Sequence, residues 1–134
     1  VAAQIADGLN PYSPAVLTTL GNGYLFKGEL DKAESTLKKA IDLDTTAYMP
    51  LHQLAVVYLR KQDEPRYVEY LTKAVTRVRV QAVGFKELCA FYSRKGDHAS
   101  IGKWLSYGLS HGLDTAYADS VCRANPQIIL PRTR

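Results

Sequence analysis

The amino-acid sequence predicts an all-α protein of about seven to eight helices, which follow one another as antiparallel pairs. Three observations lead to this prediction: an internal repeat with one fixed interval, helical spacing of the apolar residues within each copy, and turn signals between the helices. With 134 residues, 46% of them hydrophobic, the chain can bury a core of its own.

The repeat consists of columns of matching residue types that recur at one constant interval, with no insertion between the copies. Tyrosine, for example, recurs as Tyr24, Tyr58 and Tyr92. The other columns are Leu17, Leu51 and Phe85; Leu20, Leu54 and Leu88; Leu37, Leu71 and Leu105; Gly21, Ala55 and Cys89; and Ala40, Ala74 and Gly108. Chance does not produce so many columns in one register, so we expect three copies of one structural unit.

Each copy divides into two helical patterns. In the first pattern the apolar residues follow the spacing i, i+3, i+7, as in Leu17, Leu20 and Tyr24, which places them on one helical face. Ser13 and Pro14 predict the first helix start, because serine caps helices and proline is tolerated at the first helical position. The second helical patterns run through Ala33, Leu37 and Ala40, through Tyr67, Leu71 and Ala74, and through Ile101, Leu105 and Gly108.

The turn inside each copy has its own signals. Gly28 and Gly96 stand where the first helix ends and a residue with positive φ is favoured. An acidic residue then recurs as Glu29, Asp63 and Asp97. We expect its carboxylate to accept a hydrogen bond from the first backbone amides of the second helix.

The unit resembles the tetratricopeptide repeat (TPR), whose pattern is W-x2-L-G-x2-Y, then A-x3-F, then P, in a unit of about 34 residues. The first copy supplies Leu17, Leu20, Gly21, Tyr24, Ala33 and Leu37. The resemblance covers nearly the whole chain and implies a right-handed superhelix of helix pairs, a TPR-like α-solenoid, whose first helices line the concave side. It implies repeats at 14–47, 48–81 and 82–115, the second helix of a truncated upstream repeat plus a loop at 1–13, and a capping helix and tail at 116–134.

Gly21 and Gly23, near the middle of the first predicted helix, raise the alternative of a phosphate-binding loop. Gly21 shares its column with Ala55 and Cys89, so we expect it to be small where two helices approach closely. Gly23 has no such column and should cost about 1 kcal/mol relative to alanine in a helix interior. No Lys-Ser or Lys-Thr follows a glycine-rich loop, so a nucleotide site is not predicted.

The face of each first helix that is opposite to the apolar columns is the expected ligand surface of the solenoid. The residues that we expect to contact a partner in this groove are Asn22, Phe26, His52, Leu59, Arg60, Lys86 and Arg94. The amide can bond a peptide backbone through its donor and its acceptor, the cations can hold carboxylates, and the apolar members can hold an apolar side chain. Reversing the charges of Arg60 and Arg94 together should abolish binding of an acidic partner at little cost in stability.

These residues favour a non-enzymatic scaffold that binds a peptide or helical segment of a partner protein. Lys and Arg outnumber Asp and Glu between residues 57 and 95, which favours an acidic partner. The alternatives are an architectural or oligomerisation segment of a larger protein, including a homo-oligomer, and a helical repeat that binds RNA. Nucleic acid is disfavoured because Asn22, Val56 and Ala90 share one column, whereas base-reading residues recur in every repeat. Since the sequence does not begin with Met, we expect a piece of a longer protein.

Some TPR proteins clamp the C-terminal carboxylate of chaperones with Lys, Asn and Arg side chains. Only Asn22 matches that set. Thr18 and Val83 stand in place of Lys, and Gln53 stands in place of Asn. Glu87 stands in place of Arg and would repel a terminal carboxylate, so we do not expect a chaperone-tail clamp.

No pattern predicts catalysis, a metal site or a cofactor. His52, His98 and His111 have no metal-ligand spacing. Cys89 and Cys122 form no metal or disulfide pattern, and we expect both to be buried thiols, which slightly favours a reducing, cytoplasmic compartment. No apolar run approaches the roughly 18 residues that a membrane span requires.

The tail after residue 125 contains Ile128, Ile129 and Leu130 between two prolines, so it cannot extend a helix far. We expect this tail to cover the last repeat. Docking in a neighbouring groove and forming the start of a further element are the alternatives.

Overall fold

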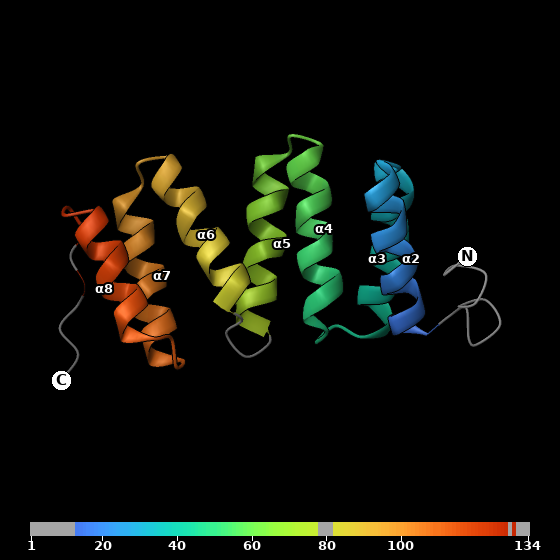
Figure 1. Ribbon diagram of the computed structural model, residues 1–134. Helices are drawn as coiled ribbons and strands as arrows, with labels where there is room; N and C mark the ends of the chain where they lie inside the picture. The colour runs from blue at the N-terminus through green and yellow to red at the C-terminus, as the bar shows by residue number, and fades with distance from the viewer. Residues whose placement is uncertain (1–12, 78–81, 129, 131–134) are drawn as a thin grey trace. The chain divides into compact units, whose positions relative to one another are not determined.

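The computed structural model describes residues 13–77, 82–128 and 130, and within them it contains seven α-helices and no β-strand (Figure 1). The helices are α2 (Pro14–Lys27), α3 (Leu30–Leu43), α4 (Tyr48–Arg60), α5 (Glu64–Arg77), α6 (Ala82–Arg94), α7 (His98–Ser110) and α8 (Thr115–Ala124). The all-α prediction is confirmed. Ser13 caps α2 as predicted, since its hydroxyl accepts the N–H of Val16 at 3.2 Å. The upstream helix expected before residue 13 lies outside the described residues.

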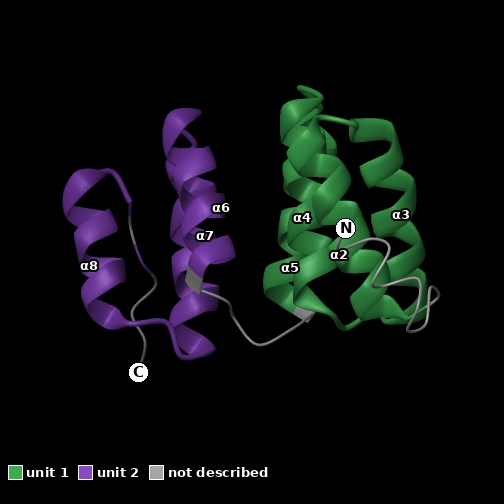
Figure 2. Ribbon diagram, turned by 45° about the vertical axis from the view of Figure 1, so that its right-hand side comes forward, with its two compact units in different colours: residues 1–78 green, residues 79–134 purple. Residues whose placement is uncertain are grey.

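The chain forms two compact units, residues 1–78 and 79–134 (Figure 2). In the first unit α2 packs against α3, α3 against α4 and α4 against α5, and α2 also contacts α4. In the second unit α6 packs against α7, and α7 against α8. The first helices of the three pairs begin at Pro14, Tyr48 and Ala82, so their starts keep the same interval as the residue columns. The bounds assigned to the repeats themselves stay a prediction.

The column residues of the sequence make the core of each unit. The fully buried column residues of the first unit are Leu37, Ala40, Leu51, Leu54, Ala55, Leu71 and Ala74, and those of the second are Phe85, Leu88 and Leu105. Burying one such leucine or phenylalanine side chain stabilises the fold by about 1.5–3 kcal/mol before the loss of conformational entropy. Leu20 and Tyr24 belong to the same columns but are only half-buried.

Three helix ends share one turn geometry. Gly28, Gln62 and Gly96 have φ angles of 80°, 62° and 69°. Each donates its N–H to the carbonyl three residues earlier, and the next residue donates to the carbonyl five residues earlier, at 2.9–3.1 Å. The predicted positive φ is confirmed at both glycines. Gln62 adopts the same positive φ although it carries a side chain, which makes this conformation less favourable than for glycine.

The acidic residue after this turn caps the second helix in two of the three pairs. Asp63 accepts the N–H of Arg66 at 3.3 Å, and Asp97 accepts the N–H of Ser100 at 3.1 Å. Glu29 makes no side-chain capping bond, so the prediction was wrong for the first pair. The shorter carboxylate of aspartate suits this position, whereas glutamate is not among the favoured capping residues.

Glycine permits close helix packing at two places. A Cβ atom at Gly21 would lie 2.5 Å from Cδ2 of Leu37, and one at Gly108 would lie 2.6 Å from Cζ of Phe85. Neither position can take a larger side chain without a shift of its neighbour, which confirms the packing role predicted for Gly21. A Cβ atom at Gly23 would meet nothing within 4 Å.

Candidate functional site

Five of the seven predicted contact residues lie in the first unit, with Asn22 and Phe26 on α2 and with His52, Leu59 and Arg60 on α4. We refer to the surface formed by these five residues as the α2–α4 face. Phe26 is 89% exposed and Leu59 is 44% exposed. Because α2 contacts α4, the structure brings these residues onto neighbouring helices of one unit.

Arg60 has a structural contact that the sequence did not reveal. Its Nη1 donates a hydrogen bond to the backbone carbonyl of Leu25 at 2.8 Å, which ties the end of α4 to the last turn of α2. The other guanidinium donors can still bind a ligand. The expectation that Arg60 can be reversed at little cost in stability is therefore wrong. A glutamate would lose this bond, worth about 1.5 kcal/mol, and would place a carboxylate near a carbonyl oxygen.

On the α4 side of the face, His52 is followed by Gln53. The ring of His52 stacks on that of Tyr48, with 5.5 Å between centroids. Gln53 is 8% exposed, and its Oε1 has no hydrogen-bond partner in the described part of the chain. Gln53 is seven residues before Arg60, so it lies two turns earlier on the same side of α4, the side that faces α2. Its Oε1 is buried, so it is not accessible to a ligand on this surface.

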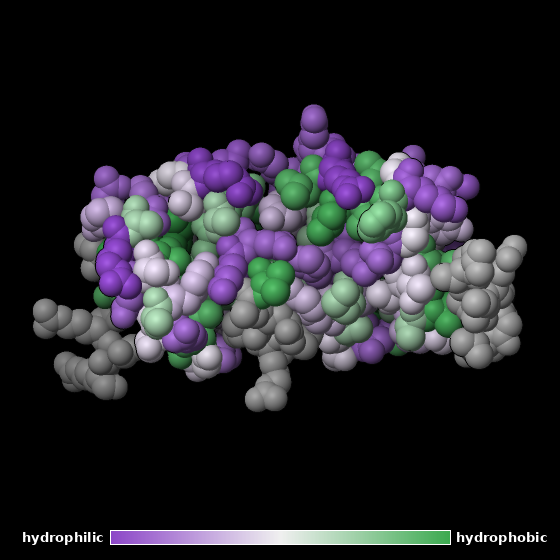
Figure 3. All heavy atoms as spheres, viewed as in Figure 1, coloured by the Kyte–Doolittle hydropathy of each residue, from purple (hydrophilic) through white to green (hydrophobic). Residues whose placement is uncertain are grey.

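The α2–α4 face carries no carboxylate from its own helices. Neither α2 nor α4 contains Asp or Glu, and their cations are Lys27 and Arg60, at the ends of the two helices. Between residues 13 and 77 of this unit, the acids lie instead on α3, on α5 and in the turns. Figure 3 shows hydrophobic side chains over the upper part of α4 and of the adjoining α2–α3 pair, beside hydrophilic ones. The two helices of this face therefore combine apolar side chains with cations.

Lys86 and Arg94, the other two predicted residues, are exposed on α6 of the second unit. The Nζ of Lys86 lies 5.0 Å from the ring centroid of Tyr117 on α8, a cation–π contact. Ser93 of α6 donates a hydrogen bond to Asn125 at 3.4 Å, and a cavity of about 280 Å³ lies between α6 and α8. The side of α6 that was predicted to bind a ligand therefore also packs against α8.

The two cysteines are not activated nucleophiles. Burial raises the pKa of Cys89 to about 12. Cys122 is half-buried, so the expectation of a buried thiol is wrong for this residue, because α8 has no helix packed on its outer side within the described residues. Burial and the charge of Asp119 raise the pKa of Cys122. Residues 13–77, 82–128 and 130 hold no group of three side chains that could bind a metal. None of the described helices combines the length and apolar character of a bilayer span.

No protein-family model matches the chain, and no curated protein matches it. Solved structures do match. The crystal structure of YrrB, described as a TPR protein with an unusual peptide-binding site, aligns with a TM-score of 0.69 and 18% identity over 84% of this chain and 58% of that chain. One crystal structure of MamA aligns with a TM-score of 0.61 and 24% identity, over 75% of this chain and 55% of that chain. A second crystal structure of MamA aligns with a TM-score of 0.64 and 19% identity, over 92% of this chain and 65% of that chain.

The chain has a TPR-like fold. The resemblance inferred from the residue columns is therefore confirmed at the level of the fold. The TPR-like chain spans between 55% and 65% of the length of these three solved chains.

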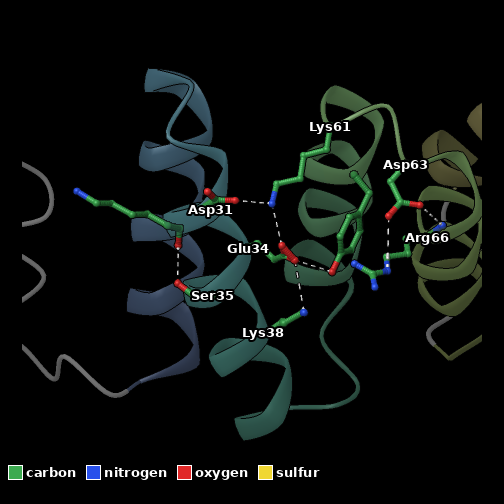
Figure 4. A network of polar contacts seen from close by, with 9 residues as sticks. Asp31, Glu34, Ser35, Lys38, Lys61, Asp63 and Arg66 are labelled. Atoms are coloured by element: carbon green, nitrogen blue, oxygen red, sulfur yellow. Dashed lines mark hydrogen bonds and ion pairs between the residues drawn. The ribbon is translucent and has the colours of Figure 1, made fainter.

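A polar network that the sequence did not reveal joins the first two helix pairs of the TPR-like chain (Figure 4). Glu34 of α3 accepts hydrogen bonds from the hydroxyl of Tyr58 and from Nζ of Lys61, each at 2.9 Å. Lys61 also donates to Asp31 at 2.6 Å, and Nζ of Lys38 lies 3.5 Å from Glu34. The side chains of Glu34 and Lys61 are only 17% and 24% exposed. We refer to these five residues as the α3–α4 network.

The charges of the α3–α4 network support one another. Burial alone would raise the pKa of Glu34, but hydrogen bonds from Lys61 and Tyr58 and the charge of Lys38 outweigh it, so the pKa lies below its ordinary value. Hydrogen bonds to Asp31 and Glu34 raise the pKa of Lys61. Both groups stay charged at neutral pH. The network therefore stabilises the contact between helix pairs and has no group prepared for proton transfer.

A cavity of about 500 Å³ lies beside α2 and α3. It is lined by Leu17, Leu20, Tyr24, Thr36, Lys39, Asp42 and Leu43. In the second pair, the equivalents of Leu20 and Tyr24 are Leu54 and Tyr58, which are fully buried where α4 packs against α3. The cavity therefore corresponds to a helix-stacking position of the TPR-like fold. The residues predicted to stack there, 1–13, lie outside the described residues except for Ser13.

Proposed function

We propose that this chain is a protein-interaction module that binds a peptide or a helical segment of a partner on the α2–α4 face. The observation that carries the proposal is Phe26, which is 89% exposed although it sits in the last turn of a well-packed helix. A large aromatic side chain on a rigid helix is typical of the few residues that dominate binding energy at protein interfaces.

The chemistry around Phe26 supports this proposal. The exposed amide of Asn22 can bond a peptide backbone, and Arg60 can bind a carboxylate with its remaining donors. The TPR fold shared with YrrB, which is described as having a peptide-binding site, adds support. We include Lys86 and Arg94 of the second unit in the proposal as separate candidate contacts for an acidic partner.

Binding of labelled peptides to the whole chain tests the proposal. Acidic peptides that contain one leucine or phenylalanine should bind, and Phe26→Ala should weaken the affinity about tenfold or more without changing the melting temperature. Leu43→Ala is the matched control, because Leu43 is also an exposed apolar residue, at 56%, but lies on α3. Equal affinities of the wild type and Phe26→Ala would contradict the α2–α4 face as the binding site.

An architectural role has one observation in its favour, the helix-stacking position marked by the cavity of about 500 Å³. If a second copy of the chain stacks there, sedimentation should show a mass that rises with concentration. Leu20→Glu should then restore the monomer, because a carboxylate cannot be buried there without a partner. A monomer at all concentrations would contradict self-association.

A further inference from the structure

The helix that carries Phe26 contains a glycine for which packing gives no reason. A Cβ atom at Gly23 would meet nothing within 4 Å, whereas one at Gly21 would lie 2.5 Å from Leu37. Gly23 is exposed, and its φ is not in the positive range. Glycine in place of alanine in a helix interior lowers the folding equilibrium constant about fivefold. A residue that weakens its own helix without a packing benefit points to a role outside the fold.

The position of Gly23 relative to Phe26 suggests that role. Side chains on a helix lean toward its N-terminus, over the residues three and four positions earlier. For Phe26 these residues are Gly23 and Asn22. A Cβ atom at position 23 would lie in open space beside this turn, with nothing within 4 Å of it. Because glycine leaves that space empty next to a ring that is 89% exposed, another chain can approach the backbone closely.

The charged side chains of α2 and α4 are both cations. Lys27 directly follows Phe26 and is exposed. Arg60 is held beside the same turn by its bond to the carbonyl of Leu25 at 2.8 Å. The next acid along the chain is Glu29, whose carboxylate is 4.0 Å from Nζ of Lys32. Apolar surface with cations at its edge is complementary to a segment that carries an apolar side chain next to carboxylates.

We propose, building on the proposed function, that Gly23 and Phe26 form an anchor subsite on the α2–α4 face. Its occupant is an acidic segment of a partner protein, which places one apolar side chain across Gly23 and onto the ring of Phe26. The carboxylates of the segment contact Lys27 and Arg60. Gly23 is a specificity-determining residue, because its missing side chain leaves room for that of the partner.

The experiment compares two substitutions that both stabilise the chain. Gly23→Ala should raise the unfolding midpoint and weaken the binding of an acidic peptide with one leucine about fivefold to tenfold. Gln62→Gly, which relieves a positive φ at a turn outside the face, should also raise the midpoint but leave the dissociation constant unchanged within about twofold. When the leucine of the peptide is replaced by alanine, Gly23→Ala should no longer weaken binding, because the side chain that it displaces is gone.

The outcomes separate this inference from the proposed function. If Phe26→Ala weakens binding but Gly23→Ala does not, the anchor subsite is overturned and the binding face stands. If peptides with lysine in place of every acid bind as tightly, the acidic occupant is overturned. If no peptide of either charge binds the wild type, both the subsite and the proposed function are overturned.

Discussion

The two units place the glycine that permits close helix packing on different helices of the pair. In the first unit the small residue is Gly21 on the first helix, which packs against Leu37. In the second unit it is Gly108 on the second helix, which packs against Phe85. The column of Phe85 holds leucine in the first unit, and the column of Gly108 holds alanine there. In this column pair a larger side chain is therefore matched by a smaller one across the helix pair, which keeps the shared volume similar.

The residues of the α3–α4 network recur along the sequence less than the core columns do. The α3–α4 network depends on Asp31 and Glu34. The equivalent residues of the next pair are Pro65 and Val68, although Tyr92 keeps the tyrosine of the network. The chain divides into its two units after residue 78, which is at the end of that second pair. The repeat therefore keeps its core columns along the sequence without keeping the acids of this network.

The largest expected effect tests the volume argument in the second unit. Gly108→Ala should lower the free energy of unfolding by about 1–3 kcal/mol, because the added methyl group has no room beside Phe85. Phe85→Leu in the same chain should recover much of this loss, since it restores the leucine and alanine combination of the first unit. Urea unfolding of the two single variants and the double variant measures the coupling between the two positions. If the losses in the free energy of unfolding were additive, the larger residue at 85 would not be compensating for the smaller one at 108.

The second prediction breaks the α3–α4 network. Glu34→Gln should lower the free energy of unfolding by about 2 kcal/mol, because Lys61 and Tyr58 lose a sheltered, charged acceptor. Glu69→Gln is the control: its pair with Lys73, at 3.3 Å on the surface of α5, should contribute only about 0.3–0.5 kcal/mol. Equal losses in chemical denaturation would show that the network is no stronger than a surface pair.

The third prediction concerns pH. The folded-state pKa of Glu34 lies below its ordinary value of 4.5, so the unfolded chain binds the proton more readily. The stabilisation is present above about pH 4.5 and is lost as the pH falls through the folded value. Lys61 has a folded pKa above 10.5, so its contribution is present below that pH and is lost as the pH rises further. The stability difference between the wild type and Glu34→Gln should therefore shrink on acidification, and a constant difference down to about pH 3 would contradict the assignment.

The sequence predicts what recurs and misses what is paired over long distances. The periodic positions predict the helices, the buried columns and the turn at Gly28, because each of these features depends on residues within one or two helical turns of one another. The bond of Arg60 to Leu25 joins residues 35 apart, and that of Tyr58 to Glu34 joins residues 24 apart, so local spacing does not reveal either. Five of the seven predicted site residues lie in one unit, but the sequence does not reveal how exposed each of them is or what it packs against.

The smallest expected effect compares the turns of the two units. Gln62 and Gly96 occupy equivalent positions with φ angles of 62° and 69°, and both turns have the same pair of backbone hydrogen bonds. A residue with a Cβ pays about 1–2 kcal/mol for this conformation, whereas glycine loses about 0.5–1 kcal/mol more chain entropy on folding. The difference predicts that Gln62→Gly stabilises the chain by about 0.5–1 kcal/mol and that Gly96→Gln destabilises it by a similar amount. Thermal unfolding of both variants measures the two effects. If both substitutions changed the melting temperature in the same direction, the turns could not be equivalent, because one backbone geometry cannot favour glycine in one unit and glutamine in the other.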